Sequence, residues 1–185
     1  VLLYAALNLA GTQEPAPILA KPAVDTPAAR AGLLEGDRIL SIGGEDWTVV
    51  VGSGHSPEHA CLWRRSDGGM ISGDQILPRI SSNISVWPTE PMADPLEDRM
   101  TSLDRVGDML PAETFVLPGH GEPFTGVLPR IEALKRGHIV SLKRLERTLR
   151  EPRRAVDVFA ALFARPVDDG ILGMATGEAV AHLGL

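Results

Sequence analysis

The sequence predicts an α/β protein in which short strands alternate with longer amphipathic helices. Fifteen prolines and nineteen glycines are spread along the chain, and this many turn-forming residues disfavour an all-helical bundle. The β-branched run Asp46–Val51 is typical of a buried strand. Pro95–Leu110 and Leu128–Arg150 repeat apolar residues at helical spacing, so each predicts a helix with one face toward a core.

Three further short strands complete the expected β structure, and two shorter helices follow near the end of the chain. The strands are predicted at Ala60–Arg64, Met70–Ser72 and Phe115–Leu117. The helices are predicted at Ala155–Phe163 and Thr176–Leu183.

Composition excludes several classes of protein. The 185 residues are 44% hydrophobic and 23% charged, which is typical of a folded globular protein and excludes wholesale disorder and collagen. The net charge of −6 provides no general attraction for nucleic acid, so we expect no nucleic-acid partner. Cys61 is the single cysteine and cannot form an intramolecular disulfide.

The segment Val1–Ala10 is almost wholly apolar but shorter than the roughly 20 residues that cross a bilayer. It lacks the positively charged start of a signal peptide, and we expect a cytoplasmic location. Since the chain does not begin with Met, we expect residues upstream of it. The segment is either an apolar helix packed on a core or the end of a longer transmembrane helix, and only the second would bring the protein to a membrane.

Three polar side chains each follow a predicted strand and a glycine. They are His55, Asp74 and His120. Taken singly, such residues commonly form turns, but strand ends are also where a rigid scaffold presents ligands. Neutral imidazole and carboxylate suit zinc, manganese or ferrous iron, and we expect the three side-chain tips to converge within about 4 to 5 Å.

The stretch Asp25–Gly44 predicts a short helix, a glycine turn at Gly36 and a strand at Asp37–Ile42. Its letters TPAARAGLLEGDRILSIGG resemble the core of a PDZ domain. The whole of Val1–Gly44 resembles the end of a transmembrane helix and the first PDZ domain of a site-2 intramembrane protease of the sigma-E regulatory type. No histidine here is followed by Glu, so the H-E-x-x-H zinc motif of that family is absent.

The letters GHSPEH, SGDQIL and VLPGHGEPF, in that order, resemble the second half of metallo-β-lactamase-fold hydrolases. This resemblance runs from about Gly43 to Leu185 and implies a partial αβ/βα sandwich with a helical C-terminal tail. It implies that His55 is a ligand of a first zinc ion, that Asp74 is the catalytic carboxylate bridging two ions, and that His120 is a ligand of the second. Manganese or iron could replace zinc.

The family's H-x-H-x-D-H motif is absent, since all five histidines follow Gly54. They are His55, His59, His120, His138 and His182. We therefore expect a hybrid chain joined between Gly36 and Trp47. Its parts are a PDZ-like segment at 1–44, a hydrolase half at 45–150 and a helical tail at 151–185. His59 is expected to support a ligand or lie on the surface, and His138 and His182 to serve packing or lie on the surface.

Two functional classes follow. The first is a metal-dependent hydrolase of a small-molecule thioester, ester or lactone, which is incomplete and therefore weakly active or inactive as this chain. The second is a PDZ-type peptide-binding fragment of an intramembrane protease. We also expect that Val1–Gly44 does not complete the first sheet of the hydrolase, because its four prolines interrupt the few strands it could form.

Overall fold

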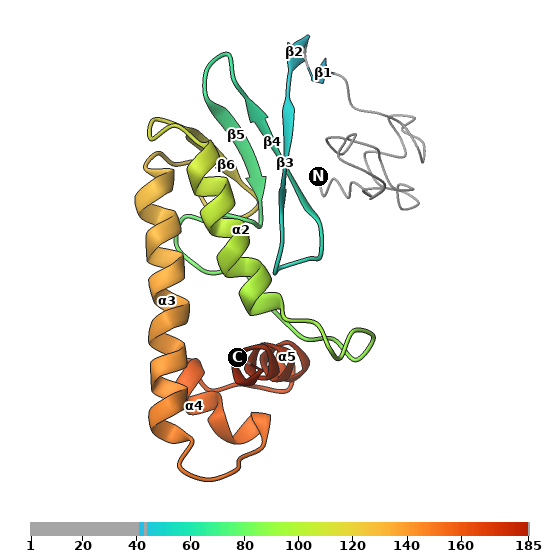
Figure 1. Ribbon diagram of the computed structural model, residues 1–185, viewed down its shortest axis with the longest axis vertical. Helices are drawn as coiled ribbons and strands as arrows, with labels where there is room; N and C mark the ends of the chain where they lie inside the picture. Colours follow the sequence, from blue (N-terminus) through green and yellow to red (C-terminus); the bar gives the residue numbers. More distant parts are fainter. Residues whose placement is uncertain (1–40, 43, 185) are drawn as a thin grey trace. The chain divides into compact units, whose positions relative to one another are not determined.

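A computed structural model describes residues 41–42 and 44–184 of the protein (Figure 1). The chain divides into two compact units, each drawn from several stretches of sequence. Of the described residues, the first comprises 41–42, 44–52, Glu58–Arg79 and Pro111–Val127, and the second comprises Ser53–Pro57, Ile80–Leu110 and 128–184. The predicted PDZ-like helix and nearly all of the strand at Asp37–Ile42 lie outside the described residues.

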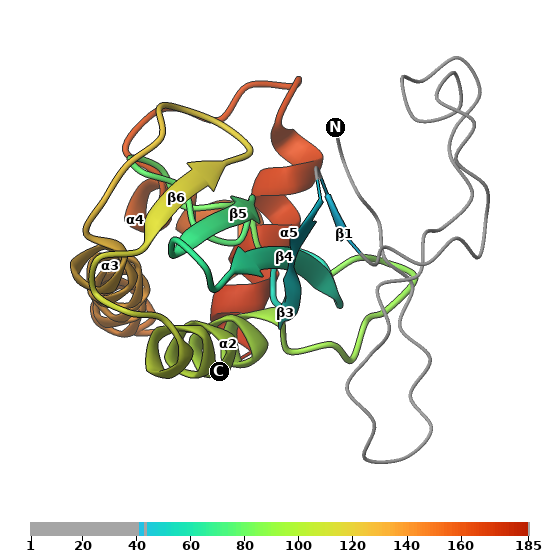
Figure 2. The same ribbon diagram turned by 90° about the horizontal axis from the view of Figure 1, so that it is seen from above.

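The first unit is built on a four-stranded mixed sheet. Its strands, in the order in which they lie side by side, are β3 (Thr48–Gly52), β4 (His59–Arg64), β5 (Gly69–Gly73) and β6 (Phe115–Pro118). Strand β4 is antiparallel to both β3 and β5, whereas β6 is parallel to β5 (Figure 2). Val50 is paired with Cys61, and Met70 with Val116. All four are buried, so each strand contributes to the core of this unit.

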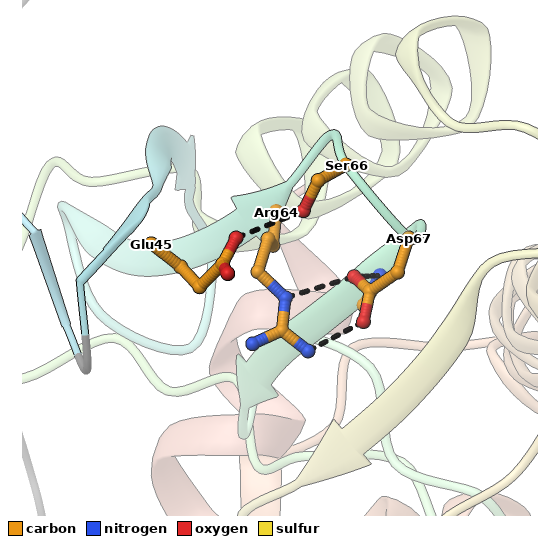
Figure 3. Close-up of polar contacts among 5 residues, drawn as sticks. Glu45, Arg64, Ser66 and Asp67 are labelled. Carbon is orange, nitrogen blue, oxygen red and sulfur yellow. Dashed lines mark hydrogen bonds and ion pairs between the residues drawn. The ribbon is translucent and has the colours of Figure 1, made fainter.

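A charged turn joins β4 to β5, at the opposite end of these strands from Gly73 (Figure 3). The guanidinium of Arg64 donates two hydrogen bonds to the carboxylate of Asp67, at 2.8 and 2.5 Å. These bonds, together with one from the backbone N–H of Gly69, lower the pKa of Asp67 to about 2. Gly68 has a φ of +75°, a conformation that favours glycine in such a turn. A short antiparallel hairpin also belongs to this unit; its strands, β1 (Ser41–Ile42) and β2 (Glu45–Asp46), have two residues each.

The second unit is helical. Its elements are α2 (Pro95–Met109), α3 (Val127–Thr148), the 3-10 helix η1 (Ala155–Val158), α4 (Phe159–Leu162) and α5 (Leu172–Leu183), as Figure 1 shows. The side chain of Asp94 caps α2 by accepting a hydrogen bond from the N–H of Glu97 at 3.0 Å. The ammonium of Lys135 pairs with Asp104, while Ile131 lies against Gly107. The numbering runs in opposite senses across these contacts, so α2 and α3 are antiparallel.

Leu145, Val158 and Ala179 form a buried cluster that joins α3, η1 and α5. This cluster fixes the C-terminal helices to the long helix by burial of apolar surface. No helix among residues 41–42 and 44–184 combines the length and the apolar character needed to cross a membrane.

The predicted long helices are confirmed to within two residues at each end. The prediction of a single helix over Ala155–Phe163 is wrong. A 3-10 turn over Ala155–Val158 comes first, and the α-helix α4 follows it. The carboxylate of Asp157 caps the 3-10 turn by accepting hydrogen bonds from the backbone and the guanidinium of Arg154. Helix α5 begins at Leu172, four residues before the predicted start, since the N–H of Ala175 already bonds to the carbonyl of Ile171.

Candidate metal centre

Two of the predicted ligands lie together at one edge of the sheet. Strands β5 and β6 are parallel and pair Gly73 with Pro118, so the residues that follow them emerge at the same edge. Asp74 Oδ1 and His120 Nε2 are 3.6 Å apart. This is too long for a hydrogen bond, but it is close to the roughly 3.4 Å that separates two donors bound to one tetrahedral zinc ion at about 2.1 Å. The pair therefore fits a metal ion.

Gly119 is required for this approach. Its N–H donates to the carbonyl of Gly73 at 2.8 Å, which ties the end of β6 to the end of β5. A Cβ atom at position 119 would lie 2.4 Å from Asp74 Oδ1, closer than non-bonded atoms can come. Gly119 thus allows the turn that carries His120 to lie directly beside the Asp74 carboxylate.

His59 supports Asp74 in the metal-free geometry. It begins β4, which is antiparallel to β5, so it lies at the edge where β5 ends. Its Nε2 accepts a hydrogen bond from the backbone N–H of Asp74 at 3.1 Å. That bond uses the lone pair with which this nitrogen would bind a metal, and His59 therefore fixes the start of the Asp74 turn. This agrees with the expectation that His59 supports a ligand.

His55 lies in the connection between β3 and β4, which belongs to the second unit. Its Nδ1 donates a hydrogen bond to the carbonyl of Asn83 at 2.7 Å, and the acceptor-only character of that carbonyl fixes the Nδ1–H tautomer. The nitrogen with a lone pair is then Nε2, which is the atom a metal would bind. Within the described residues no three His, Cys, Asp or Glu side chains are gathered as a ready metal-ligand set. The convergence of His55 with Asp74 and His120 stays a prediction.

The second unit also buries a pair of histidines on two of its helices. His138 on α3 and His182 on α5 are both at least 95% buried, and their Nδ1 and Nε2 atoms are 3.4 Å apart. Burial, with smaller effects from His182 and Arg99, lowers the pKa of His138 to about 4. Arg99 is fully buried on α2. The two histidines serve packing, as expected.

The mixed sheet and the helices define an α/β protein, and the carboxylate and imidazole at the ends of β5 and β6 form a candidate metal site. Comparison with protein families agrees with this class. The sequence model of the metallo-beta-lactamase superfamily matches residues 2–120, more than half of the chain. A model of the metallo-beta-lactamase-like C-terminal domain matches residues 142–185. The chain belongs to the metallo-beta-lactamase superfamily.

Individual relatives support this membership. A Bacillus subtilis protein described as the probable metallo-hydrolase YqjP is 40% identical over 91 residues, which are 48% of this chain and 28% of the relative. A beta-lactamase domain protein from Burkholderia ambifaria is 43% identical, with a TM-score of 0.74 over 82% of this chain and 44% of the other. The metallo-beta-lactamase family protein TTHA1429 from Thermus thermophilus is 30% identical, with a TM-score of 0.68, over 78% and 44% of the two chains.

This chain spans less than half the length of each of these relatives. The superfamily match also begins at residue 2 and continues across the proposed join between Gly36 and Trp47. The comparisons therefore give no support to a separate PDZ-like segment at 1–44.

Proposed function

We propose that this chain supplies His55, Asp74 and His120 to the metal centre of a hydrolase that cleaves small-molecule thioesters, esters or lactones. The observation that carries the proposal is the placement of Asp74 and His120 at metal-ligand separation on the ends of two parallel strands. The inclusion of His55 rests on the family resemblance and on its tautomer. The description of a Bacillus subtilis relative as a probable metallo-hydrolase supports the same class.

The donor set is one that zinc, manganese or ferrous iron accepts. A bound ion of this kind lowers the pKa of a coordinated water and polarises the carbonyl of the substrate. The residues of the chain would hold it in three ways. Asp74 offers two oxygens and can bridge two ions, and His120 offers an exposed imidazole. His59 holds the backbone N–H of Asp74, and the absence of a side chain at Gly119 leaves room for the carboxylate.

Turnover by this chain alone should be weak or absent. The H-x-H-x-D-H motif that supplies most of the remaining ligands in the family is missing from its sequence. One carboxylate and two imidazoles can hold one ion, but they do not supply the ligands of a second ion to which Asp74 could bridge. We therefore expect hydrolysis of generic thioesters and lactones to be indistinguishable from buffer. Metal-dependent turnover that disappears in His55→Ala would contradict this expectation.

Zinc binding tests the site directly. The metal-free chain is titrated with zinc in competition with a chromophoric chelator, and the same titration is made on His120→Ala, Asp74→Asn and a control, Glu113→Ala. The control removes an exposed carboxylate just before β6, at the opposite end of that strand from His120. We expect weak binding that falls in the first two variants and not in the control. Equal binding by all four proteins would refute the proposed site.

The PDZ-type alternative depends on the pattern in Asp25–Gly44, and no observation on the described residues favours it. The superfamily match includes that stretch. We therefore assign the chain to the hydrolase class alone.

A further inference from the structure

A backbone carbonyl of the helical unit accepts a hydrogen bond from the imidazole of His55. The Nδ1–H of His55 donates to the backbone carbonyl of Asn83 across 2.7 Å. Such a bond sets the tautomer and the plane of a metal-binding imidazole and raises the basicity of its other nitrogen. It can do so only if the accepting peptide is itself held still. The surroundings of Asn83 must therefore hold its peptide group in place.

The side chain of Asn83 is held at both of its polar atoms. Its Nδ2 donates to Glu178 Oε2 on α5 at 2.7 Å, and its Oδ1 accepts a hydrogen bond from the hydroxyl of Ser85 at 2.6 Å. With donor and acceptor both engaged, the amide cannot flip without losing two bonds. The residue whose carbonyl orients His55 is therefore anchored to the C-terminal helix.

The backbone of the same segment lies directly on α5. The N–H of Val86 donates to the carbonyl of Gly177 at 3.1 Å. A Cβ atom at Gly177 would lie 2.8 Å from the Cβ atom of Ser85, so only glycine lets the helix come this close. The segment 83–86 is thus attached to α5 by its backbone as well as by the Asn83 side chain.

We propose that α5 is a positioning element for the metal centre, with Asn83 and Glu178 as positioning residues that orient His55. This inference rests on the proposed function in which His55 binds metal. It assigns to the C-terminal helix, which is far from His55 in the sequence, a role in ligand geometry in addition to packing. Glu178 acts through the Asn83 amide, and Asn83 acts through its own carbonyl.

The test measures two quantities, the tautomer of the His55 imidazole and the affinity of the chain for zinc. Nitrogen-15 chemical shifts of the metal-free chain report which ring nitrogen of His55 carries the proton, and zinc competition reports affinity. The variants are Asn83→Ala, Glu178→Ala and the conservative Glu178→Gln, whose amide oxygen can still accept the Asn83 bond. The matched control is Ala179→Gly, which weakens α5 at a buried position next to Glu178 without removing either hydrogen bond.

We expect the wild-type chain and Ala179→Gly to hold His55 as the Nδ1–H tautomer. Asn83→Ala and Glu178→Ala should show a mixture of tautomers and bind zinc about 10-fold to 100-fold more weakly, with Glu178→Gln between them and the wild type. If all variants keep the wild-type tautomer, the inference is refuted. If the tautomer and the affinity change equally in Ala179→Gly, the effect is one of helix stability and the inference is also refuted.

The two proposals fail in different ways. A wild-type chain that binds no zinc would refute the proposed function, and the tautomer of His55 in the metal-free variants would then decide whether α5 orients this imidazole. Zinc binding that is lost in His55→Ala but unchanged in Asn83→Ala would keep the proposed function and refute the positioning role.

Discussion

Acid should destabilise the helical unit through one buried imidazole, His138. The Nδ1–H of His182 donates to the carbonyl of Glu178 at 2.9 Å, so His182 Nε2 carries a lone pair and accepts the Nδ1–H of His138 at 3.4 Å. The remaining nitrogen of His138, Nε2, is buried and has no hydrogen-bond partner among the described residues. A proton added there would be a buried charge beside Arg99, and for this reason the pKa of His138 is lowered to about 4.

The sign and size of the effect follow from this pKa. In the unfolded chain a histidine titrates near 6.5, so below that pH the unfolded state binds a proton that the folded state refuses. Stability therefore falls as pH falls from about 6.5 to about 4. Between pH 7 and pH 5 this one group should cost about 2 kcal/mol of unfolding free energy. Burial also lowers the pKa of His182, which adds to the loss of stability in acid. Burial raises the pKa of Glu178, which opposes that loss.

Comparison with a variant isolates the contribution of His138. Urea unfolding followed by helical circular dichroism at pH 7 and pH 5 gives the free energy at each pH. The loss on acidification should be about 2 kcal/mol smaller in His138→Gln than in the wild type. Ile139→Gln, at the adjacent exposed position of α3, is the matched control and should keep the full loss. An equal loss in wild type and His138→Gln would refute the assigned burial of a neutral imidazole.

Three further outcomes are expected. Gly119→Ala should displace the Asp74 carboxylate, because its Cβ would lie 2.4 Å from Oδ1, and it should lower both zinc affinity and stability, the latter by about 1 to 3 kcal/mol in urea unfolding. Gly177→Ala should lower stability by a similar amount, about 1 to 3 kcal/mol, since its Cβ would meet Ser85 at 2.8 Å. Asp67→Asn should leave the unfolding temperature almost unchanged in physiological salt, because the Arg64 pair is exposed and exposed ion pairs contribute little to stability.

The sheet edge could be predicted from the sequence because its signals are local. Asp74 and His120 each follow a short apolar run and a glycine, a pattern that marks the end of a strand. That the two strands are neighbours and parallel is a long-range property, since β5 and β6 are separated by α2. The family resemblance implied only that Asp74 and His120 belong to one metal centre, and periodicity could not give the strand order or direction.

The hydrogen-bond partner of His55 and the buried polar side chains of the helical unit could not be predicted, because they depend on contacts between residues distant in the sequence. Asn83 orients His55 through a backbone carbonyl, a group that every residue carries. Arg99 lies at a helical position that polarity would assign to solvent, yet it is fully buried. His138 was placed on a helix correctly, but its altered pKa arises from burial against elements distant in the sequence, with His182 lying 44 residues away.

The proposed ligands Asp74 and His55 therefore have two separate sets of supports. In the first unit, the His59 imidazole fixes the backbone of Asp74, and the absence of a side chain at Gly119 leaves room for its carboxylate. In the second, the Asn83 carbonyl fixes the ring of His55 and is itself anchored to Glu178. Each network closes within its own unit, so each ligand can be preorganised without the other. The two networks have no residue in common, so a change in one network should disturb its own proposed ligand and leave the hydrogen bonds of the other in place.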